Sequence, residues 1–382
     1  MKAARKLCIL DNSFPDQHSA FRYAEIKIYL ETLPEAVVVC VPGHIVTGLK
    51  TKPLNQLIKR FCDENPDTKG RVISYELFNS TTNHYKLLYF VFLFNVRTFR
   101  AELKRGTPFV FTLYPGGAFL PYSDETNQLL KEVFDYPGFR RVIVTQPFVR
   151  DYLVRGGFCS EEKITLIPGV VVPSEFCAPT LLEPPLRNEN EPINVCFVAY
   201  RYSEGGREKG LDIFLDVVRH LLATTDYSMR FHLVGGWQSD VFDEELRSHL
   251  IFHDAMETAQ LLEFLSKIDI LVSPNRSGEP VQGRFDGFPT GAAVQAGLAG
   301  AAVFATDCLW QNNYFKDGEE IVIISQSPSE IGDRIASYIS DRSRLESLRS
   351  AGSMAFRRLY GPEAQMGPRI ELLRKLLKAE EN

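Results

Sequence analysis

The sequence predicts an α/β protein built from two Rossmann-like, doubly wound domains that face each other across a cleft. Its 382 residues suit two domains of roughly 150–200 residues each. Short apolar runs alternate with helical segments, as is typical of a parallel sheet. This alternation stops once, at residues 178–192, where four prolines and several acidic residues indicate a linker, and then starts again. We expect one domain at 1–178, a second at 193–360, and a C-terminal helix at 361–382 that packs back on the first.

The expected elements of the first domain begin with a strand at the N-terminus. Each expected strand is a short, continuous apolar run, which is typical of strands buried on both faces of a sheet. Strands are expected at 6–10, 36–41, 108–113 and 141–145, an apolar sheet or helix element around 87–94, and helices at 18–33, 54–61, 125–133 and 149–155.

The second domain repeats this order of strands and helices. The last forty or so residues are expected to be helical, ending in a basic amphipathic stretch at 369–378. Strands are expected at 193–199, 229–234, 249–252, 268–273, 302–305 and 320–324, and helices at 211–222, 258–265 and 291–299.

Composition and charge exclude several classes of protein. Hydrophobic residues make up 45% of the chain, so a mainly disordered chain is excluded. The net charge of −5 disfavours a nucleic-acid partner, which would select a basic excess. The seven cysteines are scattered and odd in number, which favours a reducing, cytoplasmic location. The N-terminus lacks a signal-like apolar segment, and the most apolar stretch, 85–96, is too short to span a bilayer.

Two segments of the second domain could bind an anion. Arg201, Arg207 and Lys209 follow the strand at 193–199 and precede a helix, so they are expected at the carboxyl edge of the sheet. Thr290 and Gly291 open a helix of small residues, where a ligand could approach the backbone N–H groups. A solvated loop with ordinary surface cations, and tight packing between helix and sheet, would explain the same residues.

These segments occur in an order that resembles a known family. The series VAYR with EKG, FHLVGG, LLEFLSKIDILVSPNRSG, DGFPTGAAVQAGLAGAAVFATD and DGEEIVI is similar to the nucleotide-sugar domain of retaining GT-B glycosyltransferases of family 4, or glycosyltransferase group 1. Residues 142–173 resemble the family's segment before its linker, whereas the first 105 residues or so show little likeness.

The resemblance implies roles for several residues of the second domain. Lys209 and Arg201 would stabilise the donor diphosphate, although the loop here is longer than the family's, so Arg207 competes with Arg201. The first of the family's two glutamates falls on Asp286, which would hold sugar hydroxyls. The second falls on Val294 by strict count, or on Gln295 with one insertion, and we choose Gln295 as the ribose ligand.

The resemblance also implies contacts elsewhere in the chain. Tyr114 stands where the family has a histidine near the reacting sugar, and Gly116 and Gly117 follow it; a packed strand-end aromatic is the alternative for Tyr114. His253 lies in the segment expected to meet the nucleotide base. The loop at 12–15 follows the first strand and would face the acceptor.

The predicted activity is transfer of a sugar, with retention of configuration, from a nucleoside diphosphate sugar to an acceptor hydroxyl, in the synthesis of a surface glycan such as capsule or lipopolysaccharide. The alternatives are a catalytically silent nucleotide- or sugar-binding protein and a nucleotide-sugar epimerase. No Asp-x-Asp metal motif or histidine pair with ligand geometry is present, so we expect neither a metal nor a cofactor besides the donor.

The stretch at 83–105 allows a further partner. It combines five cations with a strongly apolar core that could lie in a membrane interface, near a lipid-linked acceptor. The alternative, favoured slightly by apolar residues all round the axis, is a buried element of the first sheet or its covering helix.

Overall fold

The chain divides into two compact units in a computed structural model. The first comprises Met1–Val171 and Pro362–Asn382, and the second comprises Val172–Gly361. Most of the expected linker, residues 179–190, lies outside the described residues. The structure describes residues 6–17, 19–41, 53–80, 85–178, 191–201, 203, 205–237, 243–278 and 281–380.

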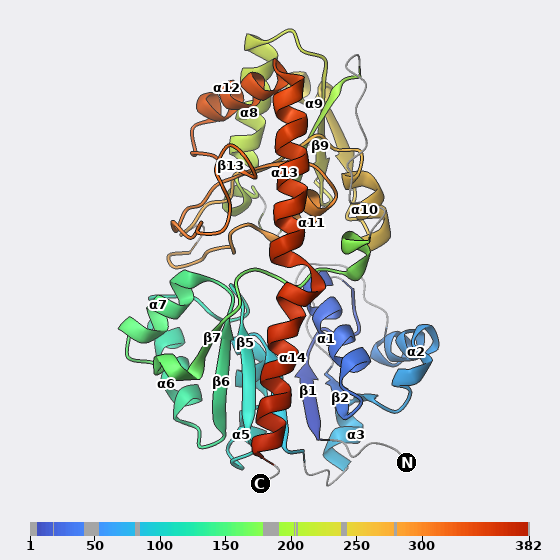
Figure 1. Cartoon of the computed structure of the whole chain (residues 1–382), viewed down its shortest axis with the longest axis vertical. Helices are drawn as coiled ribbons and strands as arrows, with labels where there is room; N and C mark the ends of the chain where they lie inside the picture. The colour runs from blue at the N-terminus through green and yellow to red at the C-terminus, as the bar shows by residue number, and fades with distance from the viewer. Residues whose placement is uncertain are drawn as a thin grey trace. The chain divides into compact units, whose positions relative to one another are not determined.

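The first unit is built on a seven-stranded parallel sheet in the order β3-β2-β1-β4-β5-β6-β7 (Figure 1). The four consecutive central strands β2, β1, β4 and β5 are buried at every position, which explains their uninterrupted apolar sequences. The strands are β1 Leu7–Asp11, β2 Ala36–Cys40, β3 Val72–Ser74, β4 Leu87–Val91, β5 Phe109–Leu113, β6 Phe139–Val144 and β7 Ile164–Leu166.

Helices of the first unit connect these strands in the order of a doubly wound sheet, and one further helix, α14, comes from the end of the chain. They are α1 Ala20–Thr32, α2 Leu54–Glu64, α3 Tyr75–Ser80, α4 Leu93–Thr98, α5 Arg100–Leu103, α6 Asp124–Asp135, α7 Pro147–Arg155 and α14 Pro362–Ala379, with single 3₁₀ turns η1 Pro66–Thr68 and η2 Glu161–Lys163. The short strands β3 and β7 and the short helices α3, α4 and α5 were not among the expected elements, because segments this short show no periodicity.

Of the stretch at 83–105 that suggested a membrane contact, residues 83 and 84 lie outside the described residues, and residues 87–91 form β4 in the middle of the first sheet. All five residues of β4 are buried, and the next residue, Phe92, has a φ of +71° and is the N-cap of α4. The buried-element alternative therefore holds for these residues, and they give no support to a membrane interface. Among the described residues, no helix combines the length and the hydropathy that a membrane crossing requires.

The final helix, α14, belongs to the first unit and lies beside α1 (Figure 1). Apolar residues of α14 such as Leu373 join those of α1, β1 and β2 in one cluster. The side chain of Gln365 donates to the carbonyl of Pro168 at 2.8 Å. Its neighbour Arg369 is fully buried in a polar cluster with Glu25, Tyr29, Tyr89 and Tyr114.

The second unit has a six-stranded parallel sheet in the order β10-β9-β8-β11-β12-β13. Its strands are β8 Ile193–Val198, β9 Met229–Val234, β10 Leu250–His253, β11 Ile270–Ser273, β12 Ala302–Ala305 and β13 Val322–Ile323. Its helices are α8 Leu211–Thr224, α9 Glu244–Ser248, α10 Thr258–Leu265, α11 Gly291–Leu298, α12 Pro328–Ile339 and α13 Arg342–Tyr360, with 3₁₀ turns η3 Ser174–Cys177 and η5 Arg207–Lys209.

The second unit begins earlier in the chain than the sequence suggested. The expected boundary lay at residue 178, but the chain divides after Val171. The reason is the turn η3, which packs against α10 and α11 and whose Phe176 is fully buried. This turn precedes the proline-rich stretch, so composition alone does not show which unit it joins.

Candidate active site

The strand order of the second sheet reverses between β8 and β11. Strands β9 and β10 extend from one side of β8, and β11 and β12 from the other. In open α/β sheets, ligands bind beyond the carboxyl ends of the strands at such a reversal. The loop after β8 carries Lys209, and the loop after β11 carries Asn275 and Asp286, so three polar residues converge at this point.

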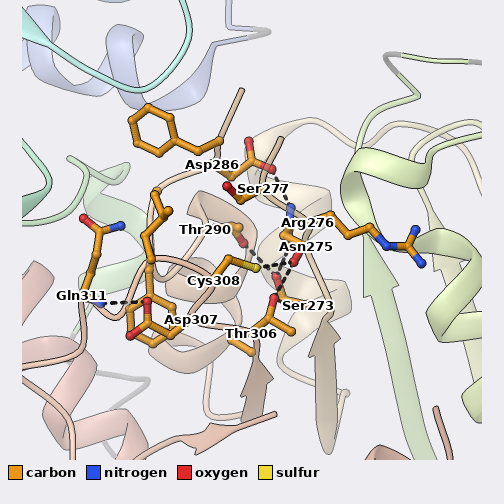
Figure 2. Close-up of a pocket in the computed structure, with 15 residues that line it drawn as sticks. Ser273, Asn275, Arg276, Ser277, Asp286, Thr290, Thr306, Asp307, Cys308 and Gln311 are labelled. Atoms are coloured by element: carbon orange, nitrogen blue, oxygen red, sulfur yellow. Dashed lines mark hydrogen bonds between the residues drawn. The ribbon is translucent and has the colours of Figure 1, made fainter. Parts of the chain in front are cut away.

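Lys209 and Asp286 form an ion pair there. The Lys209 Nζ lies 2.7 Å and 2.8 Å from the two carboxylate oxygens of Asp286. Asn275 donates its side-chain amide to the same carboxylate at 2.6 Å (Figure 2). The side chains of Lys209 and Asp286 are 15% and 30% exposed, so the pair is shielded yet reachable from solvent. Sequence reasoning identified both residues but expected each to contact a ligand separately.

A hydrogen-bond network holds Asn275 beneath this pair. Ser273 donates its hydroxyl to the Asn275 side-chain oxygen at 2.7 Å, and Thr306 donates to the Asn275 carbonyl at 2.7 Å. These residues and Asp286 line one pocket together with Asp307 and others, whereas the Arg276 guanidinium points away from Asp286 (Figure 2). The sequence analysis did not identify Asn275 and Ser273 as site residues. Their position at the end of the expected strand at 268–273 could have indicated them.

Helix α11 begins beside the pocket. Thr290 is its N-cap: the hydroxyl accepts from the Ala293 N–H at 3.3 Å and lies 3.1 Å from the Ser273 hydroxyl. Gly291 is exposed, and a Cβ built there would meet no atom within 4 Å. By contrast, a Cβ on Gly297 would lie 2.3 Å from the ring of Phe356. Packing therefore explains Gly297, while Gly291 leaves open space at the helix N-terminus.

Burial distinguishes Val294 from Gln295, the two candidates for the position of the family's second glutamate. Val294 is fully buried in the core, so its side chain cannot reach a ligand. Gln295 is half-buried, and it shares a face of α11 with Gly291, four residues earlier. Of the two positions, only Gln295 presents an accessible side chain, although it does not line the pocket around Asp286.

The three cations of the loop before α8, Arg201, Arg207 and Lys209, differ in exposure and in their partners. Arg207 is 64% exposed and lies 3.8 Å from Asp212, which Arg276 contacts at 2.6 Å. Arg201 is half-buried. Gly210 has a φ of +74°, and a Cβ there would lie 2.0 Å from the carbonyl oxygen of Pro274. The loops after β8 and β11 thus approach closely at a glycine, which keeps Lys209 beside Asp286.

Comparison with known families decides the identity of this unit. Residues 187–354 match the family model described as glycosyl transferases group 1. Most of the second unit therefore matches a group 1 glycosyltransferase domain. The match confirms the resemblance to glycosyltransferase group 1, whereas the retaining, family 4 part of that resemblance stays a prediction.

Solved structures with the same fold cover almost the whole chain. A sucrose-phosphate synthase from Thermosynechococcus elongatus is 15% identical, with a TM-score of 0.64 over 98% of this chain and 100% of its own. Anabaena Alr3699/HepE in complex with UDP is 15% identical, with a TM-score of 0.67 over 97% and 100%. A structure of trehalose-6-phosphate from Escherichia coli, bound with UDP-2-fluoro glucose, is 11% identical, with a TM-score of 0.62 over 97% and 99%.

These likenesses confirm the predicted fold class, an α/β protein of the GT-B kind with two Rossmann-like parallel sheets. Comparison of the sequence with curated proteins gives no match. Among the described residues of the chain, no group of three or more His, Cys, Asp or Glu side chains could hold a metal ion.

His253, expected near the nucleotide base, ends strand β10 of the group 1 domain. Its Nε2 lies 3.0 Å from the Nδ1 of His232, and the two rings stack with centroids 5.3 Å apart. Burial, then the charges of His253 and Arg230, lower the pKa of His232 to about 4, and burial lowers the pKa of His253. Both imidazoles are therefore neutral in the folded domain at neutral pH.

This pair predicts that the group 1 domain loses stability in acid. Unfolded histidines bind protons near pH 6.5, before the folded pair does, so stability falls as the pH drops from about 7 to about 4. Fluorescence of the buried Trp237, which lies in this domain, reports the unfolding. The His232→Gln variant should show a smaller fall over this window. An equal fall in both proteins would assign the pH dependence to other groups.

Tyr114, Gly116 and Gly117 lie in the first unit, directly after β5. The Tyr114 hydroxyl donates to Glu25 at 2.9 Å and is buried, and burial raises its pKa well above the usual range. This is the packed strand-end aromatic that the sequence left as an alternative. Gly116 is exposed, whereas a Cβ on Gly117 would meet the ring of Phe92 at 2.3 Å.

Proposed function

We propose that this protein is a retaining, metal-independent glycosyltransferase that moves a hexose from a nucleoside diphosphate sugar to an acceptor hydroxyl. The Lys209–Asp286 ion pair carries the proposal, because it lies at the reversal of the sheet in a group 1 domain. One member of the pair supplies positive charge and the other supplies hydrogen-bond acceptors, and a donor of this class needs both.

The positive side of the site would stabilise the leaving diphosphate. When the bond between sugar and phosphate breaks, negative charge grows on the diphosphate, and fixed cations lower the energy of that state. Lys209 is the nearest cation to the pocket residue Asp286 and is held in place by it. Arg201 and the exposed Arg207 lie in the same loop, and the open N-terminus of α11 at Gly291 adds backbone N–H groups.

The acceptor groups of the site would hold the sugar and the ribose. Asp286 and Asn275 line the pocket and present carboxylate and amide oxygens that accept hydrogen bonds from sugar hydroxyls. Gln295, on the same face of α11 as Gly291, is the proposed ribose ligand, and Thr290 orients the start of that helix. His253 ends the strand β10 and lies within the proposed base-binding segment at 251–254.

The first unit would supply the acceptor side. The loop at 12–15 follows β1, next to the reversal of strand order between β1 and β4. Gly116 presents exposed backbone after β5. A surface glycan is the acceptor class that the family resemblance supports. The donor is the one small molecule that this chemistry requires, with no further cofactor.

A nucleotide-binding screen tests the proposal. UDP, GDP, dTDP, ADP and CMP are added in turn, and thermal unfolding is followed by tryptophan fluorescence, because both tryptophans lie in the second unit. UDP is tested first because structural neighbours were solved with UDP or UDP-sugars. A nucleotide at a hundred times its Kd stabilises the folded state by about 2.7 kcal/mol, which raises the Tm measurably.

Turnover of the matching nucleotide sugar then separates an enzyme from a silent protein. Release of the nucleoside diphosphate supports the transferase, and the anomeric configuration of the product tests retention. Binding without any release of nucleotide favours the silent alternative. If none of the five nucleotides raises the Tm, the proposed donor class is wrong.

Activity is expected to survive removal of divalent metals. The proposed site neutralises the diphosphate with Lys209, an arginine and helix N–H groups, so a metal ion has no required place in it. Donor turnover is measured with excess EDTA and again after Mg²⁺ or Mn²⁺ is restored. Rates should agree within twofold, whereas complete loss with EDTA and recovery with Mn²⁺ would place the enzyme in a metal-dependent class.

A further inference from the structure

The loop after β12 places a tryptophan in solvent beside the pocket. Trp310 is 92% exposed, more than any other large apolar side chain among the described residues. Its neighbours on either side, Leu309 and Gln311, both line the pocket that contains Asp286. The indole itself does not belong to that lining, so it faces the outside of the pocket rather than its interior.

The loop is built to hold Trp310 in this position. Trp310 has a φ of +52°, which is unusual for a bulky residue. Its N–H donates to the Asp307 carbonyl at 3.3 Å, and the Asp307 carboxylate accepts from the N–H groups of Gln311 at 2.9 Å and Asn312 at 2.7 Å (Figure 2 shows the first of these two). Cys308 donates to the Asn275 carbonyl at 3.1 Å, which attaches the loop to the centre of the site.

The chemistry around Trp310 favours a sugar ring as its partner. An indole face is apolar and carries partial negative charge, which suits the C–H groups on one face of a pyranose. The residues that follow are amides, and Asn313 is exposed, so hydrogen-bonding groups lie next to the aromatic face. A lipid surface or a protein partner would require a contiguous apolar patch, but the other aromatic residues of this loop, Tyr314 and Phe315, are half-buried and buried.

We propose that Trp310 stacks against a sugar ring of the acceptor and so helps to select which saccharide is bound. This inference rests on the proposed function, in which Asp286 and Asn275 hold the donor sugar inside the pocket. A ring that meets Trp310 outside the pocket is then the sugar that receives the transferred residue, or the one next to it. The loop between Asp307 and Asn312 then contributes to acceptor recognition from the second unit, while the pocket binds the donor.

Binding to an array of immobilised neutral and anionic oligosaccharides tests the proposal. The labelled full-length protein, loaded with the nucleotide that raises its Tm most, is expected to bind at least one class of saccharide. Trp310→Ala should weaken that binding about tenfold, and Trp310→Phe should weaken it less because an aromatic face remains. Trp310→Gly serves as a second variant, since glycine tolerates the positive φ without strain.

A matched control and an optical signal make the result specific. Tyr227 is another exposed aromatic residue of the same unit. It precedes β9, at the amino ends of the strands, whereas Trp310 follows β12, at their carboxyl ends, so Tyr227→Ala should bind saccharide like the wild type. Trp237 is 5% exposed and donates to the Ala199 carbonyl, so acrylamide quenches mainly Trp310. The bound saccharide should protect this fluorescence from the quencher.

The inference is wrong if Trp310→Ala and the wild type bind saccharide equally well. It is also wrong if the wild type binds no saccharide, whether or not it binds lipid vesicles instead. The nucleotide-induced rise in Tm should be the same in all variants. That rise tests the proposed function separately, so its absence in the wild type contradicts the donor site and not Trp310 alone.

Discussion

Replacing Lys209 with alanine is expected to lower kcat by about 10²–10³ while the fold stays intact. The ammonium group lies 2.7 Å from the carboxylate of the pocket residue Asp286, which fixes its position. Without it, the negative charge that develops on the leaving diphosphate loses a fixed cation. Because this interaction strengthens as the bond breaks, kcat should fall much more than KM rises.

The control for this variant is Lys267→Ala in the same unit. Lys267 is 65% exposed and pairs with Glu263, four residues earlier in the chain. It has no part in the proposed site. Donor hydrolysis by this variant should match the wild type within twofold, and both variants should keep the wild-type far-UV circular dichroism. An unchanged kcat in Lys209→Ala would remove Lys209 from the site and leave Arg201 and Arg207 as the candidate cations.

The sequence predicts the central strands of the first sheet, and β11 and β12 of the second, well because they are buried on both faces. Residues such as those of β2 and β12 form uninterrupted apolar runs with clear ends, and the structure has strands at 36–40 and 302–305. The strands β3 and β7 have three residues each and lie at the edges of the first sheet, so their sequences carry no such signal.

The site was predictable in part for a similar reason. Lys209 and Asp286 follow strands whose carboxyl ends meet, and they occur within segments of recognisable order. Their direct contact was not predictable, since 77 residues separate them and either could have reached a ligand alone. Tyr114 shows the same limit: its partners Glu25 and Arg369 lie 89 and 255 residues away, so local sequence gave no sign of its burial.

Arg369 is expected to contribute more to stability than any exposed cation of its helix. Its guanidinium is fully buried, with Nε 3.9 Å from a carboxylate oxygen of the equally buried Glu25. It also donates to the Gln365 carbonyl and to the Tyr114 hydroxyl, which itself donates to Glu25. Arg369→Met would leave the Glu25 charge buried without a compensating cation, which costs about 3–5 kcal/mol.

Two further variants separate the charge effect from simple loss of packing. The double variant Glu25→Gln with Arg369→Met removes both charges, so much of the lost stability should return. Arg374→Met changes an exposed arginine of α14 and should cost little. Both tryptophans lie in the second unit, so hydrogen exchange of peptides from β4, β5 and α14 measures the stability of the first unit instead.

The expected order of exchange protection is wild type and Arg374→Met first, the double variant next, and Arg369→Met last. Peptides of the second unit should exchange alike in all four proteins, because the cluster of Glu25, Tyr114 and Arg369 lies wholly within the first unit. If the single and double variants lose the same protection, the cost comes from lost packing of the arginine stem, and the buried carboxylate is compensated by its tyrosine partners alone. If Arg369→Met exchanges like the wild type, α14 is held by its apolar face, where Leu373 and Leu377 are buried.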